Sequence, residues 1–374
     1  MECGHQIRAV HSSPKQRRIS DEKITASNAT GENQDPNTIV PEKQACGNCM
    51  LIPHYRQELQ RQYERINYLS AELNKYQKGL AWLKDDEKCN RYTGISSYAV
   101  LKKIYGFVKP YLFQASCELT KEEIFVMTLR KLRRNTPFID LADDYAICVN
   151  TASKYFHRTV KVMHDCLQYV LEPPPKEIII RHTPQAFKRY YGNRRVLVMD
   201  CFEVRTERPG IPKAANAHHS AYKMSSTTKF LIVMAADGSV AFVSNAYVGR
   251  CSDRFITVSS GFLELIEPDD VILADKGFDI ADLIESRGAT LNIPTFLRKN
   301  VQMNPLNIER DRQITSLRVH VERMIGRIKA KYTFLNGTIQ VNSLRRSENN
   351  CNTVDLITRL ACILFSFNKS IVSD

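Results

Sequence analysis

Long apolar segments are missing from this sequence of 374 residues. No apolar run approaches the ~20 residues that a helix needs to cross a bilayer. The opening residues, MECGHQIRAVHSSPKQRR, also lack the apolar segment that is typical of a signal peptide. We therefore expect an intracellular protein with no membrane partner.

Regularly spaced cysteine pairs are also lacking. The eleven cysteines are scattered, and several, such as Cys201 and Cys362, lie in apolar segments, which predicts reduced and mostly buried thiols. Cys46 and Cys49 form a CxxC spacing, but no second Cys or His pair follows at the distance typical of a zinc finger. A disulfide framework is therefore not expected, and a zinc site at Cys46 and Cys49 is the weaker interpretation.

Acidic residues are too few to balance the basic ones. Lys and Arg number 53 against 40 Asp and Glu, so the net charge is +13. An excess of positive charge attracts phosphate backbones without reading a sequence, and it favours a nucleic-acid partner. A basic surface that only faces solvent has the same composition, so both interpretations stay open.

The first 84 residues divide into two segments. Residues 1–50 are polar and lack apolar periodicity, which predicts a disordered tail. In residues 51–84 an apolar residue recurs every seven positions, at Leu59, Ile66, Leu73 and Leu80. This spacing predicts a coiled-coil-like helix and a homodimer through residues 54–84. The other heptad position is polar, so a single amphipathic helix remains the alternative.

Residues 85–170 are predicted to form an all-helical domain with helices at 97–107, 119–132, 137–145 and 151–163. In the last pair, the first helix is expected to bury Ile139, Leu141 and Ala142. The second helix is expected to start with Thr151 as its N-cap and to bury Tyr155, Phe156 and Val160. Lys154, Arg158 and Lys161 then share the opposite face. Two short helices with one apolar and one basic face are typical of a DNA-binding helix-turn-helix, although a structural hairpin has the same pattern.

Three prolines at 173–175 end the helical region, and residues 177–374 change to strand patterns. Apolar strands are predicted at 195–200, 229–234, 240–244 and 270–275, with a turn at Asp237 and Gly238. Helices are predicted at 253–265 and 314–332. This order predicts an α/β domain with a mixed sheet flanked by helices.

Two of these strands are predicted to end in carboxylates, Asp200 and Asp275, and Glu322 lies beside the apolar stripe of the last helix. A carboxylate at the end of an apolar strand is costly unless it is hydrogen-bonded or bound to a cation. Oxygen donors of this kind suit Mg²⁺ or Mn²⁺. Each acid alone is more simply a cap or turn residue. A phosphotransferase of the DxDx type is excluded because the second Asp is missing after Asp200.

Several sequence blocks together resemble the catalytic domain of PIF/Harbinger-like DDE transposases. They are LVMDCFEVRTERP, AYKMSSTTKFLIVMAADGSVAFVS, YVGRCSDRFITVSSGFLELI, DDVILADKGFDI and RVHVERMIGRIKAKY, and residues 118–163 resemble the helix-turn-helix that precedes this domain. The resemblance implies an RNase H-like fold. It also implies that Asp200, Asp275 and Glu322 are catalytic and hold two Mg²⁺ or Mn²⁺ ions. Asp253 is implied as an accessory acid, although a plain N-cap role after Ser252 is the simpler interpretation.

The resemblance further implies DNA cleavage and strand transfer at transposon ends in the nucleus. The DNA partners would be the terminal inverted repeats and the target, with or without a separate DNA-binding protein. Arg318, Arg323, Arg327 and Lys329 are expected to line a DNA groove, or else to form a solvated helix face. A domesticated, catalytically silent DNA-binding protein and a nuclease without strand transfer are the alternatives.

Overall fold

The computed structural model describes residues 47–76, 78–114, 119–294, 305–345, 352–368 and 372. The chain divides into two compact units at residues 65 and 66. Residues 1–46 of the tail predicted at 1–50, and the side chains of Cys46 and Cys49, lie outside the described residues. No helix in the described part of the chain is long and apolar enough to cross a membrane.

A helix, α1 (Gly47–Tyr76), occupies most of the segment predicted to be coiled-coil-like, but its ends differ from the prediction. It begins four residues before the predicted start, within the segment assigned to the tail. Its stripe residues Leu59 and Ile66 are 69% and 59% exposed. Leu80 does not continue the stripe, because it begins the 3-10 helix η1 (Leu80–Leu83) and is buried. The dimer remains a prediction, and α1 is the part of residues 54–84 that could form its contact.

The helical region confirms the predicted helix-turn-helix pair but corrects its details. The first helix, α5, buries Leu141 and Ala142 but leaves Ile139 58% exposed. The second, α6, begins at Val149 after Cys148, so Thr151 is not its cap. The helices of this region are α2 (Asp86–Thr93), α3 (Tyr98–Val108), η2 (Lys109–Tyr111), α4 (Lys121–Arg134), α5 (Phe138–Asp144), α6 (Val149–Leu167) and η3 (Gln168–Leu171).

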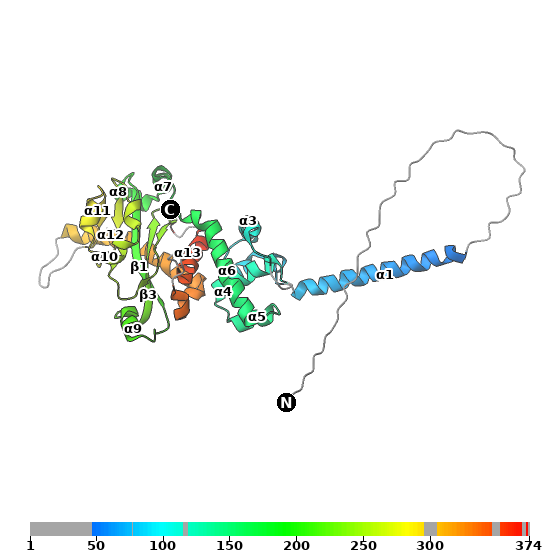
Figure 1. Cartoon of the computed structure of the whole chain (residues 1–374). Helices are drawn as coiled ribbons and strands as arrows, with labels where there is room; N and C mark the ends of the chain where they lie inside the picture. The colour runs from blue at the N-terminus through cyan, green and yellow to red at the C-terminus, as the bar shows by residue number, and fades with distance from the viewer. Residues whose placement is uncertain are drawn as a thin grey trace, which may run out of the picture. The chain divides into compact units, whose positions relative to one another are not determined.

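A mixed seven-stranded sheet forms the centre of the C-terminal region (Figure 1). Its main order is β2-β3-β1-β6-β7, and β4 and β5 also pair with β3. β3 is antiparallel to β1, whereas β6 and β7 are parallel to it. The predicted mixed sheet of an RNase H-like domain is confirmed. The strands are β1 (Val196–Arg205), β2 (His219–Ser220), β3 (Ser225–Ala235), β4 (Val240–Val243), β5 (Tyr247–Val248), β6 (Val271–Leu273) and β7 (Thr290–Asn292).

Helices cover both faces of the sheet. The helix predicted at 253–265 is interrupted at Gly261, whose φ of +85° ends a regular helix. The helix predicted at 314–332 belongs to a longer helix that starts at Pro305. The remaining helices are α7 (Lys176–His182), α8 (Gln185–Tyr191), α9 (Pro212–His218), α10 (Asp253–Ser259), η4 (Phe262–Leu265), α11 (Ala281–Glu285), α12 (Pro305–Lys331), η5 (Thr333–Asn336), η6 (Val341–Leu344) and α13 (Thr353–Ser366).

Alternation along β1 divides the packing into two cores. Val196 and Val198 point to one face and pack with α12, α13 and the helical region. Leu197 and Met199 point to the other face and pack with α10, η4 and α11. The predicted boundary at 173–175 lies within the unit 66–374, because the first core contains residues from both sides of it.

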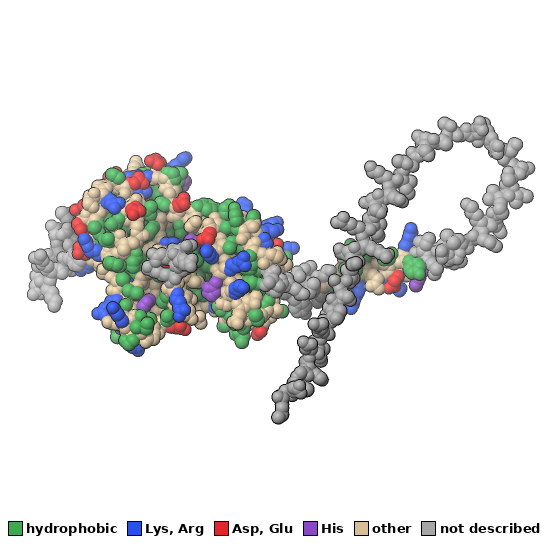
Figure 2. All heavy atoms as spheres, in the orientation of Figure 1, with side chains coloured by type: hydrophobic (Ala, Val, Ile, Leu, Met, Phe, Trp, Pro, Cys, Tyr) green, Lys and Arg blue, Asp and Glu red, His purple; other side chains and the backbone are tan. Residues whose placement is uncertain are grey.

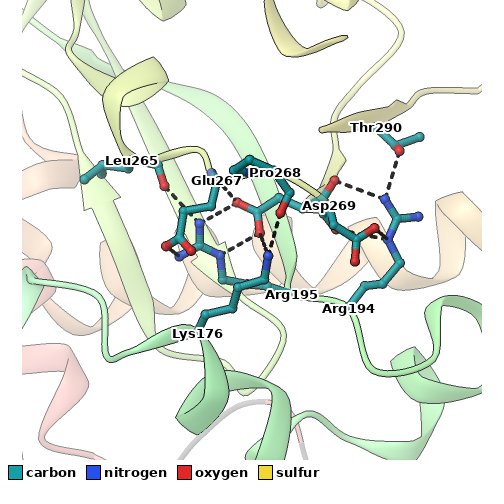
Figure 3. Close-up of polar contacts among 9 residues, drawn as sticks. Lys176, Arg194, Arg195, Leu265, Glu267, Pro268, Asp269 and Thr290 are labelled. Atoms are coloured by element: carbon teal, nitrogen blue, oxygen red, sulfur yellow. Dashed lines mark hydrogen bonds and ion pairs between the residues drawn. The ribbon is translucent and has the colours of Figure 1, made fainter. Parts of the chain in front are cut away.

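A buried ion-pair network fixes the register between β1 and β6. Arg195, just before β1, donates through Nε to Oδ1 of Asp270, just before β6, at 2.9 Å. Asp270 is fully buried, and Lys176 Nζ lies 3.3 Å from its Oδ1. Figure 3 shows this network, in which Arg195 also pairs with Glu267. Because buried charges are strongly destabilising without their partners, the network favours one alignment of the two strands.

The helical region is joined to α12 by polar contacts as well as by the shared core. Arg133 of α4 donates from Nη1 to the carbonyl oxygens of Ala330 and Lys331, at the end of α12. Thr333 Oγ1 donates back to the Arg133 carbonyl at 2.9 Å. Arg133 therefore satisfies carbonyl groups that the last turn of α12 leaves unpaired.

Candidate active site

The parallel register of β1 and β6 determines where Asp200 and Asp275 lie. Val196 pairs with Val271 and Val198 with Leu273, so residues 75 apart are opposite each other. Continued by two residues, the same register brings Asp200 opposite Asp275. Since side chains two positions apart share a face, both acids lie on the face that α12 covers.

The sequence predicted that each acid is the last residue of its strand. In the structure neither acid is. β1 continues to Arg205, and Asp200 pairs with Ile232 of β3 in its middle. β6 ends at Leu273, so Asp275 lies in the loop that follows. β1 therefore passes the end of β6, and its Asp200 carboxylate lies beside that loop.

The helix α12 carries Glu322 to the same place. Its core residues Leu317, Val321, Met324 and Ile328 are buried against the sheet, at the three- and four-residue spacing of a helix face. Glu322 directly follows Val321 and stays at the edge of the packed stripe, with a side chain that is 48% exposed. The structure thus brings together the three acids that the sequence singled out.

A guanidinium group lies among these acids. Arg318 Nη1 is 2.6 Å from Asp275 Oδ1, and its Nη2 donates to Glu322 Oε1. The Arg318 side chain is only 12% exposed. Because two carboxylates engage its charge here, the DNA contact expected of Arg318 stays a prediction.

Asp200 is the most perturbed of the acids. Its pKa is raised from 3.8 to about 6, mainly by burial and further by the negative charges of Glu322 and Asp275. A hydrogen bond from the Cys201 backbone, at 2.8 Å from Oδ1, and the positive charge of Arg318 oppose this rise. The acids are thus close enough for their charges to interact, and the site favours an additional cation.

An open pocket of about 230 Å³ gives access to the site. Asp200 and Glu322 line it from β1 and α12, and Lys329 from the next turns of α12. Tyr222 and Lys223, from the turn between β2 and β3, complete its rim. Lys329 Nζ donates to the Glu203 carbonyl at 2.7 Å, so only part of its charge faces the pocket.

The donor set of this site fits a divalent cation in its chemistry. All three donors are carboxylates, the ligands that Mg²⁺ and Mn²⁺ prefer. Arg318 shows that the space between Asp275 and Glu322 accepts positive charge. In the described ranges, however, no three His, Cys, Asp or Glu side chains are close enough to hold an ion as they stand. Convergence on a metal would therefore require Arg318 to move.

The other predicted acid, Asp253, has a different environment. Ser252 is the N-cap of α10, and Asp253 is the first helical residue. Its Oδ1 lies 2.8 Å from Lys229 Nζ of β3, and it interacts with the thiol of Cys201. Cys201 follows Asp200 and points to the opposite face, so this contact attaches α10 to the sheet. The accessory role of Asp253 remains a prediction.

The remaining predicted DNA-binding residues differ in exposure. Arg323 and Arg327 are exposed on α12. On α6 the buried side chains include Tyr155, Phe156 and Val160, as predicted. Its opposite side exposes Lys154, Arg158 and Lys161, which we call the α6 basic face.

The sequence patterns missed the rim of the pocket. Tyr222 and Lys223 lie inside a block that resembles the family, but a turn carries no apolar periodicity that would single them out. The signal was an aromatic and a basic residue inside an otherwise small and polar stretch, AYKMSST. Their position became apparent only after β2 and β3 were paired.

Comparisons with known proteins agree with the fold and the order of the domains. Residues 199–366 match the family model described as DDE superfamily endonuclease. Residues 117–168 match the model described as helix-turn-helix of DDE superfamily endonuclease. The PIF/Harbinger-like subfamily remains a prediction.

No curated protein matches the chain. Among solved structures, the chain is similar to a "Mos1 transposase paired-end complex with left transposon end", with 11% identity and a TM-score of 0.19 over 52% of this chain and 67% of that chain. The two family models together show that this chain carries a DDE superfamily endonuclease domain preceded by the helix-turn-helix of that superfamily.

Proposed function

We propose that the chain is a PIF/Harbinger-like transposase that cleaves DNA phosphodiester bonds at transposon ends and transfers the freed strand, with Mg²⁺ or Mn²⁺ as cofactor. The observation that carries this proposal is the meeting of Asp200, Asp275 and Glu322 on one face of the sheet. A substrate of this kind places the protein in the nucleus.

Each acid has a separate part in the proposed chemistry. Asp200, on β1, and Asp275, in the loop after β6, would hold the cations from the sheet, and Glu322 would complete the ligand set from α12. A bound pair of ions would supply the activation of water or a 3′-hydroxyl and the stabilisation of the leaving oxygen. Arg318 would then be released from its two carboxylates to contact a phosphate, since its guanidinium suits that group.

DNA binding is assigned to surfaces separate from the acids. The α6 basic face is exposed and suits the phosphate backbone or the major groove. Arg323 and Arg327 on α12 provide exposed positive charge near the pocket. Binding and cleavage are therefore separable by substitution.

The test uses a labelled duplex built from the DNA that flanks the gene, incubated with Mg²⁺ or Mn²⁺. Asp200→Asn, Asp275→Asn and Glu322→Gln are each expected to abolish nicking and to leave DNA affinity nearly unchanged, because each removes a metal charge but no phosphate contact. Glu309→Gln, an exposed acid on the same helix α12, is the matched control and should nick normally. Wild-type nicking by any of the three variants would refute the site.

The same assay separates the alternatives. A domesticated DNA-binding protein would bind the duplex without nicking it. A nuclease without strand transfer would nick the duplex but yield no joined products. Joined products that require all three acids would support the transposase.

A further inference from the structure

The turn between β2 and β3 exposes apolar side chains beside the candidate active site. Residues 221–224 connect Ser220, the last residue of β2, to Ser225, the first of β3. Tyr222 is 85% exposed and Met224 is 78% exposed. Nothing in the described chain covers these two side chains, so this turn, which we call the 221–224 turn, is available to a partner.

Partly buried hydrogen bonds hold the base of this turn in place. Glu203 of β1 accepts a hydrogen bond from Ser220 Oγ at 3.1 Å and another from Thr227 Oγ1 at 2.7 Å. The backbone N–H of Lys223 donates to Ser220 Oγ at 3.3 Å. Met224 has a φ of +49°, which is unfavourable for a side chain of its size. The turn is thus fixed to the strand that carries Asp200.

Positive charge surrounds the exposed ring. Lys223 Nζ lies 4.7 Å from the centre of the Tyr222 ring. The pKa of Lys329 is lowered, first by burial and then by the positive charge of Lys223, with a smaller contribution from Arg205. Figure 2 shows Lys and Arg side chains at the end of the domain that carries α9, where Lys213 is exposed. This charge selects a polyanion.

The turn also shares the pocket with the acids. Tyr222 and Lys223 line the same cavity of about 230 Å³ as Asp200 and Glu322. A DNA strand whose scissile phosphate reached the acids would pass beside this turn. An exposed aromatic ring offers a stacking surface to any base, and a lysine beside it offers a phosphate contact.

We propose that the 221–224 turn binds the unpaired nucleotide next to the scissile phosphate, with Tyr222 stacking on the base and Lys223 contacting the phosphate. This inference rests on the proposed DNA-cleaving function. Met224 widens the apolar surface at the tip. Single-stranded or locally opened DNA is then preferred at this position over a fully paired duplex.

The test measures binding in EDTA, so that cleavage plays no part. The probe is a fluorescein-labelled oligothymidine strand, and its affinity is measured by fluorescence anisotropy. Tyr222→Ala is expected to weaken binding roughly 5- to 150-fold, the range found for the loss of one stacked base. Tyr222→Phe keeps the ring and should bind like wild type. Tyr111→Ala removes another exposed ring, 64% exposed on η2, and is the matched control.

Photo-crosslinking locates the contact directly. The same strand with 5-iodouracil in place of thymine should crosslink to the peptide that contains Tyr222, and Tyr222→Ala should lose this product. Affinity within twofold of wild type for Tyr222→Ala, or a crosslink elsewhere, would overturn the proposal. A change in mass by light scattering without a change in DNA affinity would also overturn it, since the turn would then contact a second copy.

These experiments distinguish a failure of the proposed cleavage function from a failure of the proposed stacking site. Asp200→Asn should retain both the affinity and the crosslink, because it alters no surface of the turn. If Tyr222 binds the strand but no metal supports nicking, the proposed function fails while the stacking site stands. If nicking occurs and Tyr222→Ala binds normally, only the stacking site is wrong.

Discussion

Removing the charge of Asp200 should stabilise the metal-free protein. The pKa of Asp200 is raised from 3.8 to about 6, mainly by burial, so the folded state binds its proton more tightly than the unfolded state does. One pKa unit corresponds to about 1.4 kcal/mol, which makes the ionised carboxylate cost the folded state at most about 3 kcal/mol. Because the pocket admits water to Asp200, we expect Asp200→Asn to gain about 1–3 kcal/mol at pH 7.5.

The pH dependence follows from the direction of this shift. An acid whose pKa is raised by folding destabilises the protein as the pH increases from about 4 to 6, and the cost is constant above that range. At pH 4 the folded carboxyl is protonated and the unfolded one is about half protonated, so the advantage of Asp200→Asn should shrink to a small part of its value at pH 7.5. In saturating Mn²⁺ the order should reverse at pH 7.5, because only wild type gains the full binding energy.

The assay is chemical denaturation in EDTA at pH 4 and pH 7.5, followed by circular dichroism. Asp270→Asn is the matched control, since it makes the same chemical change at a buried acid that Arg195 and Lys176 neutralise. This control should lose about 3–5 kcal/mol, as expected when a buried ion pair is broken. Destabilisation by Asp200→Asn at pH 7.5, or an equal effect at both pH values, would refute the reasoning.

Three further outcomes are expected. Alanine at all three residues of the α6 basic face should shallow the log-log salt dependence of DNA binding by roughly one unit for each lost phosphate contact, and an unchanged slope in a folded variant would make this pair a structural hairpin. Glu at Leu59 and Ile66 should lower the mass measured by light scattering, since both are exposed on α1, and an unchanged mass would locate the contact elsewhere. Arg318→Ala should enlarge the thermal stabilisation by Mn²⁺, because Asp275 and Glu322 lose their competing cation; an equal or smaller increase in Tm would contradict this role.

Much of the fold was predictable because its central elements are strongly apolar and regularly spaced. β1, β3, β4 and β6 are short apolar runs with turn residues between them, and the buried stripe of α12 repeats at helical spacing. Short elements such as β2, β5 and α9 were missed, because two to seven residues carry too little periodicity. Their formation depends on β3, which offers them an edge to pair with or pack against.

The candidate site was predictable in its acids but not in its electrostatics. The two aspartates stood out because each follows an apolar run, and the helix spacing placed Glu322 beside the core. The sequence did not show that Arg318, four residues before Glu322, reaches back to Asp275. That contact depends on how α12 packs on the sheet, which is a property of the folded domain. The wrong assignments of Ile139 and Thr151 have a similar cause, since tertiary packing determines which turn of a short helix is buried.

The contact of Arg133 with the end of α12 bears on the distance between the proposed DNA-binding face and the proposed cleavage site. α4 packs on α6, and Arg133 of α4 attaches to the helix that carries Glu322, with one core beneath them all. Within the described residues, the α6 basic face and the acids therefore belong to one packed unit. A duplex held by that face would be cut a constant number of base pairs away, whatever the intervening sequence. Loosening this joint, for example by Arg133→Ala, should blur the position of the cut before it slows the cutting.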